Sequence, residues 1–235
     1  MAQEKRIALV TGASRGIGKA VALELARQGW RVIAAARAQK ALEQLDDHIR
    51  ELGGEATLVP LDLRDGAAID QLGAALYERF GKLDALAACA GVLGSLTPAH
   101  QVAPAVMDET MTVNFTANWR LIRALHPLLK LSHAGRAVFV TSGASRNLRA
   151  YWSPYSASKA ALDALVACYA RELEVTSIKA NLFNPGPART TMRAKAFPGE
   201  DPMTLPTPEE IAPSIIEMLQ PAYQENGAWV QFERK

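Results

Sequence analysis

Short apolar segments alternate with longer segments of helical period along most of the 235-residue chain. The apolar segments favour β-structure, and segments of this length and kind are typical of buried strands. We expect seven strands: Ile7–Val10, Arg31–Ala36, Ala56–Leu61, Asp84–Ala88, Arg136–Thr141, Ile178–Phe183 and Ala228–Phe232. The expected helices span about 16–28, 38–52, 65–80, 104–132, 154–174 and 208–219, with a break expected in the fourth. This alternation predicts an α/β fold: a doubly wound, mostly parallel seven-stranded sheet with helices on both faces.

No segment of the sequence marks a linker between two domains. Pro and Gly are spread through the loops, and no repeat or low-complexity tract occurs, so we expect a single domain over residues 1–235. Residues 187–208 differ, because they form a long segment that is rich in Pro and short of periodicity. We name this segment the flap, since such loops are typical of mobile covers over active sites.

Composition narrows the class of function. The formal net charge is +2 and no cluster of like charges occurs, which argues against a nucleic-acid partner. The chain begins with a short polar segment rather than a signal peptide, and no apolar stretch approaches the roughly 20 residues of a membrane span. Neither the four histidines nor Cys89 and Cys168 show metal-ligand spacing. We therefore expect a cytoplasmic protein without a metal or a membrane partner.

A glycine-rich loop follows the first expected strand and begins the first expected helix. It reads Thr-Gly-Ala-Ser-Arg-Gly-Ile-Gly over residues 11–18. Glycines let a backbone turn tightly against a pyrophosphate, and the helix N-terminus offers free N–H groups. A Walker A loop is excluded by the spacing and by Ala20, which stands where a Ser or Thr would hold magnesium. The loop predicts a dinucleotide site that includes Gly12, Ser14, Arg15, Gly16, Ile17 and Gly18.

The end of the second strand bears on the choice of nucleotide. An NAD site has a carboxylate there for the ribose 2′-hydroxyl, whereas this chain reads Ala-Ala-Ala-Arg over residues 34–37. Arg37, with Arg15 in the glycine loop, is suited to pair with a 2′-phosphate. The pattern favours NADP(H) over NAD(H).

A tyrosine and a lysine four residues apart predict proton chemistry. Tyr155 and Lys159 share one face of an expected helix. A phenol with a pKa near ~10 exchanges protons poorly at neutral pH, but an ammonium ~4 Å away supplies about 4 kcal/mol at a dielectric of ~20. We therefore expect a lowered pKa for Tyr155. Ser153 as the N-cap and Pro154 in the first turn are expected to fix where the helix begins.

Together, Thr-Gly-x-x-x-Gly-x-Gly and the distant Tyr-x-x-x-Lys resemble the short-chain dehydrogenase/reductase family in its classical branch, over essentially the whole chain. The resemblance implies a three-layer Rossmann fold and a nicotinamide-dependent oxidoreductase acting on CH–OH or C=O groups. It also implies a catalytic set of Asn114, Ser142, Tyr155 and Lys159. Further cofactor contacts implied by it are Asp62, Leu63, Ala90, Gly91, Tyr155, Lys159, Pro185, Gly186 and Thr190.

The chemistry of hydride transfer agrees with these roles. When hydride passes between nicotinamide and a carbonyl carbon, the oxygen must gain or lose a proton. Tyr155 would be the acid or base, and Ser142 would hydrogen-bond the substrate oxygen. Lys159 would lower the tyrosine pKa and hold the nicotinamide ribose, and Asn114 would position a water molecule and the lysine.

Two positions depart from the family pattern. Cys89 stands where the family carries an asparagine that ties the sheet together, and a thiol is a much weaker hydrogen-bonding group. We interpret Cys89 as a packed core residue whose presence bears on local stability. Ala188 replaces a larger residue of the family near the carboxamide.

The substrate stays open at this point. Candidate pocket residues between Ser142 and Tyr155 are Arg146, Asn147, Arg149, Tyr151 and Trp152. Arg189, Arg193 and Lys195 add positive charge to the flap. This charge suits an anionic or acyl-carrying substrate, but such side chains are more commonly hydrated at the surface without binding a ligand.

Alternative functions also stay open. A 3-oxoacyl-thioester reductase is one, although residues 175–177 lack the basic residue that docks a carrier protein. A non-catalytic, nucleotide-sensing regulator of the same fold is another. The chain looks closer to an uncharacterised bacterial oxidoreductase subgroup with a Pro-Gly-x-x-Arg-Thr-x-Met-Arg flap. A homodimer or homotetramer built on the helices Asn114–Leu131 and Tyr155–Glu174 is implied by the resemblance only.

Overall fold

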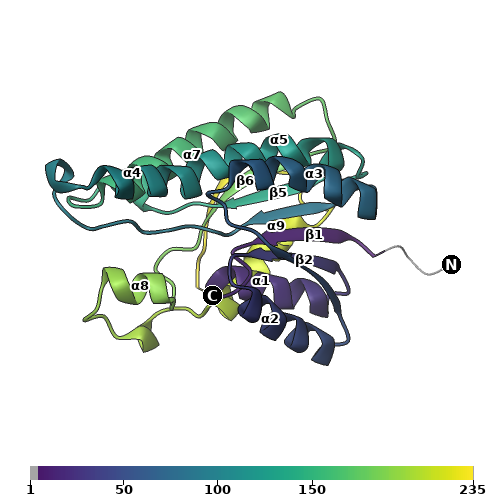
Figure 1. Ribbon diagram of the computed structural model, residues 1–235, viewed down its shortest axis with the longest axis horizontal. Helices are drawn as coiled ribbons and strands as arrows, with labels where there is room; N and C mark the ends of the chain where they lie inside the picture. Colours follow the sequence, from purple (N-terminus) through teal and green to yellow (C-terminus); the bar gives the residue numbers. More distant parts are fainter. Residues whose placement is uncertain (1–4, 235) are drawn as a thin grey trace.

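The seven apolar segments form one parallel sheet in the computed structural model, which describes residues 5–234 (Figure 1). The strands are β1 (Ile7–Thr11), β2 (Arg31–Ala36), β3 (Glu55–Pro60), β4 (Ala85–Ala88), β5 (Arg136–Val140), β6 (Lys179–Asn184) and β7 (Trp229–Gln231). They lie in the order β3-β2-β1-β4-β5-β6-β7, and every pair is parallel. The chain therefore winds outward in both directions from β1 and β4. Ligands of such sheets bind beyond the carboxyl ends of the strands at this switch point.

Helices cover both faces of the sheet and make it the middle of three layers. Their bounds are α1 (Gly16–Arg27), α2 (Gln39–Glu51), α3 (Gly66–Phe80), α4 (Pro104–Met111), α5 (Ala117–Lys130), α6 (Ala144–Asn147), α7 (Ser153–Glu172), α8 (Thr191–Ala196) and α9 (Pro208–Leu219). One face carries α1, α2 and α9, and the other carries α3, α5 and α7 (Figure 1). The expected Rossmann architecture is thereby confirmed.

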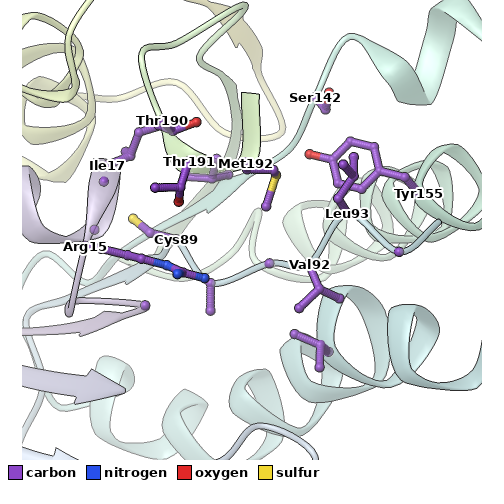
Figure 2. Close-up of a pocket in the computed structure, with 18 of the residues that line it drawn as sticks. Arg15, Ile17, Cys89, Val92, Leu93, Ser142, Tyr155, Thr190, Thr191 and Met192 are labelled. Carbon is purple, nitrogen blue, oxygen red and sulfur yellow. The ribbon is translucent and has the colours of Figure 1, made fainter. Parts of the chain in front are cut away.

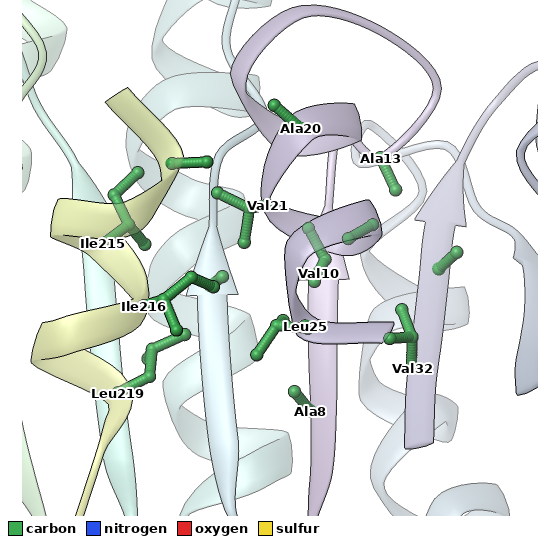
Figure 3. Packing of buried hydrophobic residues seen from close by; sticks show 14 of the residues in the cluster. Ala8, Val10, Ala13, Ala20, Val21, Leu25, Val32, Ile215, Ile216 and Leu219 are labelled. Carbon is green, nitrogen blue, oxygen red and sulfur yellow. The ribbon is translucent and has the colours of Figure 1, made fainter. Parts of the chain in front are cut away.

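Alternation along the strands divides the core into two clusters. In β1, Ala8 and Val10 face α1 and α9, whereas Ile7 and Leu9 face the opposite layer. Figure 3 shows the first cluster, where Leu25 of α1 packs with residues of α9. Because both faces of the sheet are buried, the strands are apolar throughout, which is why the hydrophobic pattern located them.

The long helix expected over 104–132 is broken. It consists of α4 and α5 joined by a π-helical turn, Thr112–Thr116. Such turns insert an extra residue into a helix and are frequent at functional sites. Helix α6 and the 3₁₀ turns Ala99–Gln101 and Pro202–Thr204 were not expected, because elements this short leave no periodic signal.

The flap contains more structure than its sequence predicted. Thr190 caps α8 by accepting a hydrogen bond from the backbone N–H of Arg193. The Arg193 guanidinium in turn donates two hydrogen bonds of 2.6 Å to Glu200. The expectation of a segment without helical structure is therefore wrong for residues 191–196. Helix α8 projects beyond the three layers (Figure 1).

Within residues 5–234, no helix combines the length and the hydrophobicity needed to span a bilayer.

Candidate active site

A cleft of about 790 Å³ opens beyond the carboxyl ends of the central strands, between the glycine loop, the loop after β4, α7 and the flap. Every residue expected to contact the cofactor lines it, as do Ser142, Tyr155 and Lys159. Asn114 does not line it, because its side chain is fully buried. The structure thus brings together sequence segments that lie up to about 180 residues apart.

Two positions of the glycine loop are packed so closely that only glycine fits them. Gly12 has φ +67°, and a Cβ atom there would lie 2.9 Å from the Ala90 Cα atom. A Cβ atom on Gly18 would lie 2.4 Å from the carbonyl oxygen of Gly12. Arg15 is the N-cap of α1, and its side chain caps none of the helix's N–H groups. The first turn of α1 can therefore bind a phosphate through its N–H groups, which is what the dinucleotide requires.

Two exposed arginines line the cleft beside the glycine loop and the end of β2. Arg15 and Arg37 both line it, and neither has an ion-pair partner within residues 5–234. Asp62 is bound to Arg64 at 2.6 Å, which lowers the Asp62 carboxyl pKa, with a smaller contribution from Arg37. Both arginine side chains are thus available to a 2′-phosphate. The described residues contain no group of three or more His, Cys, Asp or Glu side chains that could hold a metal ion.

Helix α7 presents Tyr155 from its first turn. The expectation that Ser153 is the N-cap is wrong, because Trp152 occupies that position and Ser153 is the first helical residue. The Ser153 hydroxyl is buried and has no hydrogen-bond partner among the described residues. Pro154 lies in the first turn, as expected. The preceding loop sets the helix start, since Tyr151 takes a left-handed conformation with φ 70°.

The protonation of the tyrosine–lysine pair is controlled by burial. The Lys159 Nζ atom lies 5.9 Å from the centre of the Tyr155 ring and donates a 2.8 Å hydrogen bond to the Val140 carbonyl. Burial lowers the pKa of Lys159 to about 8, although Asp163 and Cys89 oppose the change. Burial also raises the pKa of Tyr155, and a hydrogen bond with Ser142 opposes it. The expected lowering of the Tyr155 pKa is therefore wrong for this structure, because loss of hydration outweighs the stabilising interactions.

Asn114 lies in the π-helical turn and connects three parts of the site. Its amide oxygen accepts from the Val92 N–H, and its amide nitrogen donates to the Val92 carbonyl and to the Ser158 hydroxyl. These bonds hold the loop after β4 against α7, which carries Tyr155. Asn114 therefore contributes to the frame around the cleft rather than to its surface.

Sequence reasoning missed Asp163, one turn beyond Lys159 on α7. Its carboxylate accepts hydrogen bonds from Thr141, from the Ser145 hydroxyl at 2.7 Å and from the Trp229 indole at 3.1 Å. Because Thr141 immediately precedes Ser142, the carboxylate fixes the strand end that carries the serine. The (i, i+4) spacing from Lys159 was the available signal.

Asn184, at the end of β6, was also missed. Its side-chain oxygen accepts from the N–H groups of Gly143 and Gly186 at 3.0 and 3.1 Å. The loop after Ser142 is thus tied to the Pro-Gly turn at the base of the flap. Only the strand order, which places β5 beside β6, reveals this connection.

The two departures from the family pattern lie on the cleft wall. Cys89 packs against the first core cluster, and burial raises the pKa of its thiol to about 12. A thiol with this pKa stays protonated and unreactive at neutral pH, in agreement with a packed residue. Ala188 is buried and lines the cleft.

Comparison with known proteins places these features in a family. The sequence model of a family described as short chain dehydrogenase matches residues 6–201. The uncharacterized oxidoreductase YciK of Escherichia coli K12 is 40% identical over 217 residues, which cover 91% of this chain and 86% of that protein.

Two solved structures superpose closely on the chain. A short chain dehydrogenase from Shigella flexneri 2a, complexed with NADP, has a TM-score of 0.92 at 37% identity and covers 96% of both chains. One from Escherichia coli CFT073, complexed with NADPH, has a TM-score of 0.91 at 37% identity and covers 96% of this chain and 95% of that one. The resemblance inferred from the sequence is confirmed.

Proposed function

Because the chain belongs to the short-chain dehydrogenase family, we propose that it is an NADP(H)-dependent oxidoreductase that acts on a carbonyl or alcohol substrate, with Tyr155 as its acid/base. One observation carries the proposal. The side chains of Tyr155 and Ser142, which both carry hydroxyl groups, lie close together in the cleft (Figure 2). The buried Nζ atom of Lys159 lies 5.9 Å from the centre of the Tyr155 ring. The fold, one nucleotide-binding domain over residues 1–235, would supply the whole site.

The cofactor assignment rests on the cleft and on the relatives. The nicotinamide, when bound, supplies or accepts the hydride. The N–H groups of the first turn of α1 would bind its pyrophosphate, while Arg15 and Arg37 would bind the 2′-phosphate. The NADP and NADPH complexes of the two solved relatives support this choice over NAD(H).

The pKa directions at the site support a role for Tyr155 as an acid. With its pKa raised, the phenol remains protonated at neutral pH and can donate its proton to a carbonyl oxygen. Ser142 would hydrogen-bond the same oxygen and stabilise its developing charge. Lys159, charged below a pH of about 8, would stabilise the tyrosinate left after the transfer. At neutral pH the protonated Tyr155 is therefore in the form that carbonyl reduction requires.

Asn114 and Asp163 would act through other residues. Asn114 holds the Val92 backbone and Ser158, and Asp163 holds the strand end before Ser142. We assign both residues to positioning of the catalytic groups. We further propose a homodimer or homotetramer that forms through α5 and α7. Two exposed apolar side chains support it: Trp119 lies on α5, and Leu131 is the C-cap residue of that helix.

The test is a Tyr155→Phe variant. It should lose NADPH-consuming turnover of aldehydes, ketones, quinones and 3-oxoacyl thioesters, while its fluorescence-detected affinity for NADPH stays within about twofold of wild type. Tyr77→Phe is the matched control, because Tyr77 is exposed on α3 and does not line the cleft. Retained turnover would exclude the role of Tyr155.

The same screen separates the alternatives. Turnover confined to thioesters would favour a 3-oxoacyl-thioester reductase. NADPH binding by the wild-type protein without oxidation by any carbonyl compound would favour a nucleotide-sensing regulator.

A further inference from the structure

The reacting end of the cleft has an apolar lining. Six side chains from the loop after β4, α4 and α8 surround the approach to Tyr155: Val92, Leu93, Leu96, Val106, Met192 and Ala196. In Figure 2, Val92, Leu93 and Met192 are grouped around the same hollow as Ser142 and Tyr155. Ser95, Glu109 and Thr191 line the cleft from the same elements, so hydrocarbon covers part of this surface, and Ser142 and Tyr155 supply the hydroxyl groups for a carbonyl oxygen.

Trp152 adds a flat aromatic wall to this lining. Its ring meets the Tyr155 ring edge to face, with 6.0 Å between centroids, and lies 5.7 Å from the ring of Phe197 at an interplanar angle of 36°. The indole therefore connects the acid/base residue to the flap. Of the five residues between Ser142 and Tyr155 that the sequence offered as pocket candidates, only Trp152 lines the cleft.

The loop that carries Trp152 is held in a strained conformation. Leu148 and Tyr151 have φ values of 45° and 70°, a region that non-glycine residues rarely adopt. Such strain persists only where the surrounding structure enforces it, and it is concentrated at functional sites. This loop leads directly into Trp152, the N-cap residue of α7.

The arginines of the flap are engaged within the protein. Arg193 binds Glu200 through two hydrogen bonds and stacks 3.7 Å above the centre of the Phe197 ring. Arg189 donates to backbone carbonyls of the flap, including that of Pro202 at 2.7 Å. An anionic substrate would have to break these contacts to gain a guanidinium. Lys195, exposed on α8, is the cleft-lining flap cation that has no such bond among the described residues.

The loop between β5 and α7 also offers no cation to an anion. Arg146 lies 3.8 Å above the centre of the Trp229 ring, and neither it nor Arg149 lines the cleft. Lys159 is buried and bound to a backbone carbonyl. The positive charge counted in the sequence therefore does not form an anion site at the reacting end.

We infer that the substrate is a small, uncharged carbonyl compound with a flat aromatic body, and that Trp152 is the residue that selects it. This inference rests on the proposed function, since it names the substrate class of the same site. An aromatic substrate that packs on the indole gains binding free energy that a small polar aldehyde does not. Loss of this contact corresponds to a decrease of about tenfold in kcat/KM. The effect should fall mainly on KM, because the contact lies away from the atoms that react.

The experiment uses three aldehydes that differ in shape or charge, and each variant is compared with wild type on the same aldehyde, so that differences in intrinsic reactivity cancel. Methyl para-formylbenzoate is flat and neutral, para-formylbenzoate is its anionic counterpart, and glyceraldehyde is small and polar. NADPH consumption with each is measured for wild type, Trp152→Ala, Trp152→Phe and Lys195→Gln. Tyr77→Ala is the matched control, because this aromatic side chain is 57% exposed on α3, does not line the cleft and lies outside the loop that carries Trp152. The affinity of each variant for NADPH checks that its cofactor site is intact.

In wild type, kcat/KM for the neutral ester should exceed that for the anion by about tenfold or more, because the anion loses hydration without gaining an ion-pair partner. Trp152→Ala should lower kcat/KM for the ester about tenfold, and Trp152→Phe should recover most of it. Glyceraldehyde turnover should change less than about threefold in both variants, and Tyr77→Ala should resemble wild type.

Three results would overturn the inference. The first is a higher kcat/KM for the anionic aldehyde that Lys195→Gln abolishes. The second is an equal loss of kcat/KM for glyceraldehyde and for the ester in Trp152→Ala. The third is an unchanged kcat/KM for the ester in that variant. Each of these leaves an active NADPH-dependent reductase, so the proposed function would survive. If no carbonyl compound oxidises NADPH, the proposed function fails and the inference fails with it.

Discussion

Replacing Lys159 with methionine should change how the stability of the protein depends on pH. The lysine is 3% exposed, and burial lowers its pKa from 10.5 to about 8. In the unfolded chain the same group regains its ordinary pKa. The unfolded state therefore binds more protons between pH 8 and pH 10.5, and stability must rise with pH over that window.

The magnitude follows from the two pKa values. At about 1.4 kcal/mol per pKa unit, the buried ammonium costs about 3 kcal/mol of unfolding free energy below pH 8. The cost declines as the pH rises and vanishes above 10.5, so the change between pH 7 and pH 10 is about 2.5 kcal/mol. Methionine fills similar space and does not titrate. It also leaves the Val140 carbonyl without its donor, but that penalty is independent of pH.

The assay is urea unfolding of both proteins at intervals between about pH 7 and pH 10, followed by tryptophan fluorescence. The wild-type protein should gain about 2.5 kcal/mol relative to Lys159→Met across this range. Two other buried groups do not confuse the comparison. In the unfolded chain Cys89 and Tyr155 begin to titrate within this range, at their ordinary pKa values of 9.0 and 10.0, but both proteins contain these groups, so their contribution cancels in the difference.

Lys195→Met is the control, because that lysine is exposed on α8 and its loss should leave the pH dependence unchanged. Parallel stability curves for wild type and Lys159→Met would refute the reasoning, since they would show that burial does not penalise the ammonium. The same titration predicts that kcat/KM for carbonyl reduction falls as the pH rises through about 8, where Lys159 loses its charge.

Three further predictions test the cofactor site, the frame and the core. Arg37→Ala should lower kcat/KM about tenfold with NADPH and little with NADH, because an exposed charge-assisted pair contributes about 1–2 kcal/mol; equal losses with both cofactors would contradict the assignment. Asp163→Asn removes a charge that raises the pKa of Lys159, so the alkaline fall in kcat/KM should move to lower pH, and an unmoved pH profile would exclude this coupling. Gly73→Ala would place a Cβ atom 2.2 Å from a carbonyl oxygen of α5 and should cost about 1–3 kcal/mol in urea unfolding, whereas Gly199→Ala, with open space around it, should cost little.

The fold was predictable from the hydrophobic pattern because the sheet is buried on both faces. Strands such as β1 and β2 are continuous apolar segments, and amphipathic helices separate them. The hydrophobic pattern does not reveal which strands pair with one another in the sheet. The strand order, and with it the position of β6 beside β5, depends on contacts between residues about 40 positions apart.

Local turn chemistry was less predictable. Ser153 followed by Pro154 has the sequence of a capped helix start, yet the N-cap is Trp152. The strained loop before α7 shifts the boundary by one residue, and no local propensity favours a tyrosine at φ 70°. Thr207 and Glu210, where nothing strained precedes the helix, form the capping box that their spacing favours.

The candidate site likewise combines a local part, which the sequence predicts, with a non-local part, which it does not. The glycine loop is a local feature, since its glycines, its helix start and Arg15 are consecutive in the sequence. The frame around Ser142 is non-local, because Asp163 and Asn184 reach it from α7 and β6. Spacing on a helix therefore identified the tyrosine and the lysine but could not reveal the groups that hold them.

The electrostatics of the pair show why spacing alone misleads. An (i, i+4) lysine predicts a more acidic phenol only if both groups stay hydrated or in close contact. In this protein the two groups are buried together, so the pKa of Tyr155 rises and that of Lys159 falls. Each change favours the uncharged form, and at neutral pH the phenol keeps the proton that a carbonyl oxygen needs. In the mechanism that we propose, burial keeps Tyr155 protonated and ready to donate, and we expect the loss of the Lys159 charge to limit activity as the pH rises.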